Sequence, residues 1–188
     1  TDLNVSGTIP AALNGLYLRN GPNPFLPPNP ATHHWFVGDG MLHGIRLEGG
    51  KALWYRNRWV RSTEISQALG ETPVPGNPSE SPNTNVVAMA GRIWALVEAG
   101  GLPVEVSDTL ETRARSDFDG LLRKGYTAHP HLDPLTGETH AICYSGQSQT
   151  TIWHTVITPE GKVRRHEPIA VENGPSIHDC MITKNHVI

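Results

Sequence analysis

Two histidine-containing segments are the parts of this sequence that could do chemistry. Residues 127–134 (TAHPHLDP) place His129 and His131 two positions apart beside a turn. Neutral imidazole is a common ligand of zinc, iron and copper, so this pair could supply part of a metal site. In residues 176–183 (SIHDCMIT), His178 lies in an alternating stretch with one face free to point into a cavity. Taken alone, each histidine is more typical of a structural residue than of a ligand.

A zinc hydrolase is one interpretation of the first segment. His129, His131 and Asp133 follow the His-x-His-x-Asp pattern of the metallo-β-lactamase hydrolases. Pro130 interrupts the strand that this motif would need, and Pro134 stands where a further histidine would be expected. The zinc hydrolase therefore stays as the weaker alternative.

The composition excludes several classes of protein. The chain has 188 residues, 37% of them hydrophobic and 18% charged, which fits one ordinary globular domain. A formal charge of -3 gives no basic field, so we expect no nucleic-acid partner. Two cysteines, Cys143 and Cys180, and no signal-peptide pattern argue against a disulfide framework and favour the cytoplasm. The apolar stretches are too short for a transmembrane segment, and peripheral membrane contact stays open.

The elements that must position the histidines are short strands. With 19 Gly and 16 Pro, turn signals recur about every ten residues from Gly38 onward, the rhythm of a sandwich, barrel or propeller. The pattern predicts three hairpins, one strand centred on Trp94, one helical turn and one surface excursion. They cover residues 42–60, 152–171 and 133–144 (hairpins), 89–99 (strand), 65–69 (helical turn) and 68–82 (excursion).

Two further segments carry polar groups of interest. Glu98 closes an apolar strand just before Gly100, and a carboxylate buried there would need a partner. Residues 19–24 (RNGPNP) have glycine and proline in loop order but resemble no phosphate-binding loop.

Taken in order, motifs along nearly the whole chain resemble those of the carotenoid cleavage oxygenases. No single motif carries this resemblance, but several follow one another in the order of that family. They are residues 15–24 (GLYLRNGPNP), 34–43 (HWFVGDGMLH), 57–61 (NRWVR), 83–86 (NTNV), 95–100 (ALVEAG), 127–130 (TAHP), 133–134 (DP), 136–138 (TGE) and 177–179 (IHD).

The resemblance implies an all-β fold, the N-terminal part of a seven-bladed β-propeller with loop and short helical insertions. Residues 1–188 would form a partial carotenoid-oxygenase-like propeller domain whose C-terminal part is absent. Residues 186–188 also look like the inside of a strand, so we expect the sequence to be incomplete.

The resemblance also implies a metal centre. His129 and His178 correspond to two of the four histidines that hold Fe(II) in this family, whereas His131 is not a ligand. Glu98 corresponds to the carboxylate that accepts the ring N–H of a ligand, here that of His178, and so fixes its orientation. Thr84 corresponds to a residue near the open coordination position. No catalytic residue beyond the metal centre is implied.

The implied activity is that of a non-haem iron(II) dioxygenase. It would cleave a conjugated C=C bond of a carotenoid or apocarotenoid with O₂ to give two carbonyl products, and stilbenes are an alternative substrate class. An apolar polyene offers several similar double bonds, so positioning would select the one that is cleaved. A propeller remnant without catalysis is the alternative function. We expect the 188 residues alone to be inactive and to bind iron weakly, because the third and fourth ligands would lie outside them.

Overall fold

The computed structural model describes residues 3–75, 81–122, 125–174 and 176–188. Within these residues the chain forms three antiparallel sheets and a short helix, α1 (Thr63–Ala68). The first sheet contains β1 (Gly15–Pro22), β2 (Gly40–Glu48) and β3 (Lys51–Trp59). The second contains β4 (Asn85–Met89), β5 (Arg92–Leu96), β6 (Val104–Val106) and β7 (Thr112–Arg115). The third contains β8 (His131–Leu132), β9 (Thr139–Cys143), β10 (Thr151–Ile157) and β11 (Val163–Ala170).

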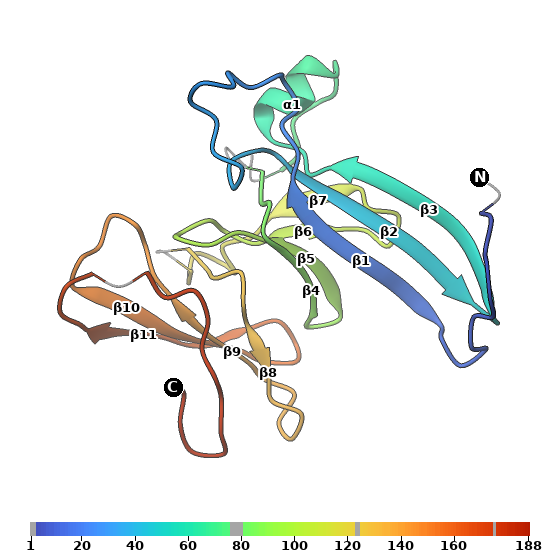
Figure 1. Cartoon of the computed structure of the whole chain (residues 1–188). Helices are drawn as coiled ribbons and strands as arrows, with labels where there is room; N and C mark the ends of the chain where they lie inside the picture. The colour runs from blue at the N-terminus through green and yellow to red at the C-terminus, as the bar shows by residue number, and fades with distance from the viewer. Residues whose placement is uncertain (1–2, 76–80, 123–124, 175) are drawn as a thin grey trace.

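Each sheet is a meander in which consecutive strands pair with one another. The sheets follow one another through space in chain order, with β4–β7 between the other two (Figure 1). The all-β class expected from the sequence is therefore confirmed. The described residues form three separate sheets and no closed ring.

The three predicted hairpins are confirmed, because their turn residues have the backbone angles that tight turns need. Gly49 and Gly50 join β2 to β3 with φ values of 55° and 79°. Gly161, with φ of 79°, lies in the turn between β10 and β11. In the third turn the backbone N–H of Asp133 donates to the carbonyl of Glu138 at 2.8 Å, which closes β8 onto β9.

The strand expected over residues 89–99 and centred on Trp94 is confirmed as β5, but its bounds were too wide. Met89 ends β4 and pairs with Arg92, which begins β5, so a two-residue turn divides the segment. Ala90 and Gly91 both have positive φ, 51° and 70°, as hairpin turns that follow the strand twist require. Alanine rarely adopts such a φ, so its presence concealed the turn.

Residues 19–24 also differ from the loop that their glycine and prolines suggest, because the first four of these residues belong to β1. Pro22 lacks a backbone N–H, but β1 is an edge strand of its sheet, where proline is tolerated.

The helical turn expected over residues 65–69 lies largely within α1. The hydroxyl of Ser62 accepts a hydrogen bond from the backbone N–H of Ile65 at 3.2 Å and caps the helix. Of the predicted surface excursion, residues 76–80 lie outside the described residues. No helix in the described part of the chain is long and apolar enough to cross a membrane.

Two hydrophobic clusters cover the two faces of the middle sheet. Along β5, the side chains of Trp94 and Leu96 enter a cluster shared with the third sheet, through residues such as Trp153. Ala95, between them, enters a cluster shared with the first sheet, through Leu42. This alternation follows the period of two of a strand. Packing on both faces fixes the positions of the ends of β4 and β5.

Candidate metal centre

Predicted site residues lie at strand ends of the second and third sheets. Thr84 directly precedes β4, and its backbone N–H donates to the carbonyl of Leu96, the last residue of β5, at 3.1 Å. Glu98 follows two residues later. Because β4 and β5 are antiparallel, the start of one and the end of the other lie at the same end of the sheet. His129 lies two residues before β8 and also reaches this end.

A glycine contact lets the loop that follows Glu98 approach the loop that leads to His129. Gly125 has φ of 83°, and a Cβ atom built on it would lie 2.1 Å from the carbonyl oxygen of Gly100. No side chain fits at that separation. Backbone packing of this kind brings Glu98 and His129 close together.

Two asparagine side chains tie this region to its neighbours. The amide of Asn85 donates to the carbonyl of Ala128, the residue before His129, at 2.8 Å. The amide of Asn20, in β1, donates to the carbonyls of Pro82 and Asn85 at 2.9 and 3.0 Å. The chain therefore has direct polar links from the first sheet through the start of β4 to the His129 segment.

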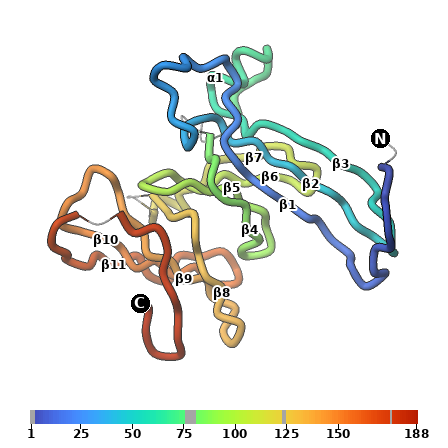
Figure 2. Tube along the Cα trace, in the orientation of Figure 1, coloured from blue at the N-terminus to red at the C-terminus, as the bar shows by residue number. Residues whose placement is uncertain are grey.

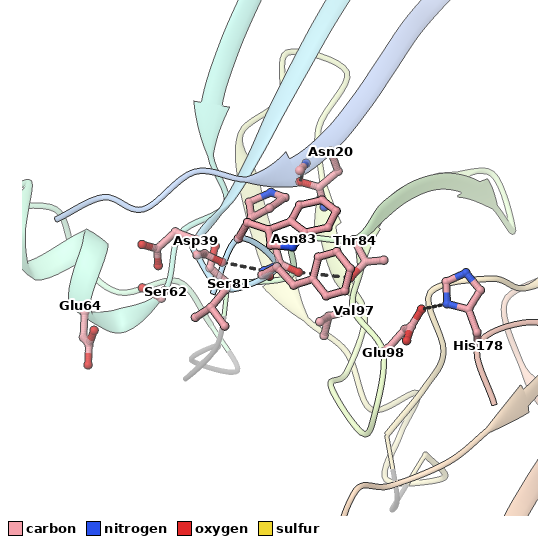
Figure 3. Close-up of a pocket in the computed structure, with 16 residues that line it drawn as sticks. Asn20, Asp39, Ser62, Glu64, Ser81, Asn83, Thr84, Val97, Glu98 and His178 are labelled. Atoms are coloured by element: carbon pink, nitrogen blue, oxygen red, sulfur yellow. Dashed lines mark hydrogen bonds and ion pairs between the residues drawn. The ribbon is translucent and has the colours of Figure 1, made fainter. Parts of the chain in front are cut away.

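The structure brings Glu98, His129 and His178 together, with their potential ligand atoms all within 4.8 Å of one another. Nδ1 of His178 lies 2.5 Å from Oε1 of Glu98 (Figure 3). The two imidazole rings have centroids 4.4 Å apart and planes inclined by 50°. The metal-ligand roles of the two histidines stay a prediction, and the geometry is compatible with it.

Each of the two rings has a nitrogen that could bind a metal ion. Nδ1 of His178 lies within ion-pair range of Oε1 of Glu98, so with its proton on Nδ1 the ring keeps a lone pair on Nε2. Nε2 of His129 is buried and has no hydrogen-bond partner. It lies 3.5 Å from Oε1 of Glu98, within ion-pair range but without the geometry of a hydrogen bond. A buried ring nitrogen without a partner is costly, and a metal ion would satisfy it.

Tyr144 is a functional candidate that the sequence did not indicate. Its hydroxyl donates to Oε2 of Glu98 at 3.2 Å, while Oε1 serves His178. Burial raises the pKa of the Tyr144 phenol, and the neighbouring Glu98 carboxylate raises it further. The phenol therefore stays protonated and holds the carboxylate. The two residues lie 46 positions apart, and no local pattern links them.

The zinc-hydrolase alternative is wrong, because its three residues do not converge. His129 belongs to the Glu98 group, whereas Nε2 of His131 bonds Oδ1 of Asp179 at 2.8 Å. Asp133 accepts the backbone N–H of Leu135 and stabilises the turn after β8. The hydrogen bond from His131 is also the main cause that lowers the pKa of the Asp179 carboxyl.

A pocket of about 920 Å³ lies beside the histidine group. Glu98 and His178 stand at one end of it, Thr84 and Val97 lie next to them, and Glu64 stands at the other end (Figure 3). Large apolar side chains also line the pocket, namely Pro22, Trp35, Phe36 and Val37. The loop between β1 and β2, which carries Trp35 to Val37, projects from the first sheet on the same side as α1 (Figure 2). The site is therefore open to an apolar ligand.

The comparisons with known proteins identify the family. A family model described as retinal pigment epithelial membrane protein matches residues 1–188. A carotenoid cleavage oxygenase of Mycobacterium tuberculosis is 49% identical over 195 residues, which cover 100% of this chain and 39% of that protein. The chain belongs to the carotenoid cleavage oxygenase family. The resemblance found in the motifs is thus confirmed.

Other members of the family agree with this assignment. A carotenoid 9,10(9',10')-cleavage dioxygenase of Phaseolus vulgaris is 31% identical and matches 100% of this chain and 40% of its own length. The crystal structure of Pseudomonas brassicacearum lignostilbene dioxygenase has a TM-score of 0.82 and 28% identity, covering 97% of this chain and 42% of that one. Cobalt-substituted Synechocystis apocarotenoid oxygenase has a TM-score of 0.75 and 26% identity, covering 98% and 44%. This carotenoid cleavage oxygenase chain therefore spans about two fifths of the length of the curated relatives that it matches.

Proposed function

We propose that this chain is the N-terminal part of a non-haem iron(II) dioxygenase that cleaves a conjugated C=C bond of a carotenoid or apocarotenoid. One observation carries the proposal, namely the convergence of His129 and His178 on Glu98. A carboxylate in contact with Nδ1 of one ring and a buried, unpartnered Nε2 on the other are what an imidazole-rich metal site needs.

The residues present fit iron(II). His129 and His178 would hold the ion, Glu98 would fix the orientation of His178, and Tyr144 would hold Glu98. Iron(II) would supply the redox centre at which O₂ and an electron-rich alkene react. Both oxygen atoms enter the two carbonyl products, so the reaction needs no further reductant and no acid or base from the protein.

In the complete fold that we propose, the three sheets are consecutive blades of a seven-bladed β-propeller. Two more histidine ligands would come from blades outside these 188 residues. The exposure of the site supports this arrangement, because the His178 side chain is 70% exposed while that of His129 is 25% exposed. One side of the histidine pair is thus open to further ligands.

The pocket supports an apolar polyene as substrate. Trp35, Phe36 and Val37 are more than half exposed although they are large and apolar. They would contact the hydrocarbon chain and help to place one double bond at the metal. The same three side chains would suit a peripheral contact with a membrane that holds such a substrate.

A stilbene is the second candidate substrate, because the lignostilbene dioxygenase has a high structural similarity to this chain. We prefer a carotenoid or apocarotenoid, because the relative with 49% identity is named a carotenoid cleavage oxygenase. Incubation with a carotenoid, an apocarotenal and a hydroxystilbene would decide between them. Turnover of the hydroxystilbene alone would reject the preferred substrates.

The function is tested with the protein expressed from its complete reading frame. Anomalous scattering at the iron edge should place one ion within bonding distance of His129 and His178. Mass spectrometry after reaction under ¹⁸O₂ should find one labelled oxygen in each carbonyl product. If the protein contains no iron and cleaves none of the three substrates, a non-catalytic propeller remnant would be favoured. Tight one-to-one iron binding by the 188 residues alone would overturn the expected need for further ligands.

A further inference from the structure

The segment that carries His178 has no regular structure of its own. None of the described residues between Ala170, which ends β11, and Ile182 lies in a helix or a strand. His129, by contrast, lies next to β8, which pairs with β9, and the preceding residue is bonded by Asn85. The two candidate ligands therefore differ in how firmly their backbones are held.

One hydrogen bond connects the two segments directly. Nε2 of His131, at the start of β8, lies 2.8 Å from Oδ1 of Asp179, and 48 positions separate these residues. Since the ionised carboxylate only accepts, Nε2–H of His131 is the donor. Each partner stands within two residues of a candidate ligand, His131 beside His129 and Asp179 beside His178.

The geometry of Asp179 is fixed on its own side as well. Its Oδ1 also accepts the backbone N–H of the next residue, Cys180, at 2.7 Å, and the Cys180 side chain is buried. Three successive residues thus attach the segment. His178 contacts Glu98, Asp179 accepts from His131, and Cys180 packs inside.

We propose that the hydrogen bond between His131 and Asp179 is a brace that positions His178 against His129 before the metal binds. This inference rests on the proposed metal site and adds two positioning residues to it. Ligands that are already oriented lose less conformational freedom when they bind an ion, so a brace of this kind raises metal affinity. His131 and Asp179 act through His178 and do not touch the metal.

The brace should affect the position of the His178 side chain more than the overall stability of the protein. The side chains of His131 and Asp179 are 37% and 50% exposed, and pairs this exposed contribute little to stability. Loss of the pair should therefore leave a folded protein whose His178 is less well placed. This difference separates a positioning role from a general structural one.

The test uses the protein from its complete reading frame, stripped of metal and titrated with cobalt(II), whose visible spectrum reports the ligand geometry. Asp179→Ala and His131→Ala should each weaken cobalt affinity about tenfold and alter the spectrum, as loss of an outer partner of a ligand does. The double variant should be no weaker than either single variant, because both remove the same bond. Asp179→Asn should restore most of the affinity, since its amide oxygen can still accept from His131 and Cys180.

Glu105→Ala is the matched control, because it removes an exposed pair with Arg92, 3.0 Å long, in the middle sheet. It should leave cobalt affinity and spectrum unchanged. Wild-type affinity and spectrum in both Asp179→Ala and His131→Ala would overturn the brace and leave the proposed function intact. Absence of cobalt binding by the unmodified protein would overturn the proposed function and the brace with it. Melting temperatures measured on the same samples should stay within a few degrees of wild type.

Discussion

Two groups of histidines lie in neighbouring regions of this molecule, and they are built differently. His129 and His178 meet at Glu98 and come from segments outside the strands. His140 and His154 lie within β9 and β10, and Nδ1 of the first is 3.3 Å from Nε2 of the second. The second group is made up of the histidines in strands β9, β10 and β11 of the third sheet. Besides His140 and His154 it includes His166 in β11, which bonds the hydroxyl of Thr155.

The difference shows why closeness alone does not indicate a metal site. Strand pairing sets His140 and His154 on one face of adjacent strands, where side chains a few ångströms apart are a consequence of the sheet. His166 pairs with Thr155 and so lies on the opposite face. Arg164 and Arg165 line the same pocket as His140 and His154, and their charge opposes a cation. No ladder brings His129, His178 and Glu98 together, so their convergence is the more informative observation.

Removal of a candidate ligand should show the largest difference between the two histidine groups. In the protein from its complete reading frame, His129→Ala should lower iron affinity by more than the 10–100-fold typical of outer partners, about 100-fold or more, and abolish turnover. His154→Ala, the matched change among the histidines of the third sheet, should leave both within about twofold, because its ring bonds another histidine and lies outside the Glu98 group. Iron content and product formation measure the two effects. Equal losses in the two variants would mean that the groups do not differ in function.

Substitution of Glu98 should have the next largest effect. Glu98→Gln keeps the shape of the side chain but removes the negative charge beside Nδ1 of His178, so iron affinity should fall about 10–100-fold. Glu138→Gln is the control in the third sheet, where the carboxylate lies 2.6 Å from Nε of Arg164 and 4.0 Å from the ring of His140. Competition with a chelator gives the affinities. A Glu98→Gln protein that binds iron like wild type would remove Glu98 from the site.

Much of the fold could be predicted because its signals are local. Turn residues such as Gly49 and Gly161 mark the hairpins, whereas Ala90 concealed a turn because alanine seldom adopts its φ. The histidine pair and Glu98 could be proposed from ordered motifs only. Contacts made across the fold left no such signal.

The undetected contacts belong to the outer part of the site. Tyr144 reaches Glu98 across 46 positions, and His131 reaches Asp179 across 48. Neither pair has a spacing that a helix or a strand would produce, so tertiary structure alone reveals them. Their residue types are common at turns and in strands, which hides them further.

Removal of the Tyr144 hydroxyl should have a smaller effect than removal of Glu98. Tyr144→Phe deletes one hydrogen bond to Oε2 of Glu98 and should cost about 1 kcal/mol, or about fivefold in iron affinity. Thr155→Val deletes a buried hydroxyl that bonds His166 in the second group. It should lower the melting temperature without changing iron affinity. The reverse pattern would show that Tyr144 supports the fold rather than the site.

The smallest effect is expected from pH. It is a change in the free energy of unfolding that arises from His166, in the third sheet. Burial lowers the pKa of His166 below its ordinary value of 6.5, because the charged ring loses water. Between that lowered pKa and 6.5, the unfolded chain binds more protons than the folded one, so the free energy of unfolding increases with pH. The contribution of His166 to the free energy of unfolding should therefore be constant above about pH 6.5 and should fall as the pH drops below 6.5.

His166→Gln removes this titration and should reduce the loss of stability between pH 7.5 and pH 5, measured by chemical denaturation at both values. Burial lowers the pKa of His154 in the same direction, so part of the acid sensitivity should persist in the single variant. Iron affinity at pH 7.5 should not change, because His166 bonds Thr155 and not the Glu98 group. Equal acid sensitivity in His166→Gln and wild type would mean that burial of this ring does not govern stability. An accompanying loss of iron would join the two histidine groups into one functional unit, contrary to their geometry.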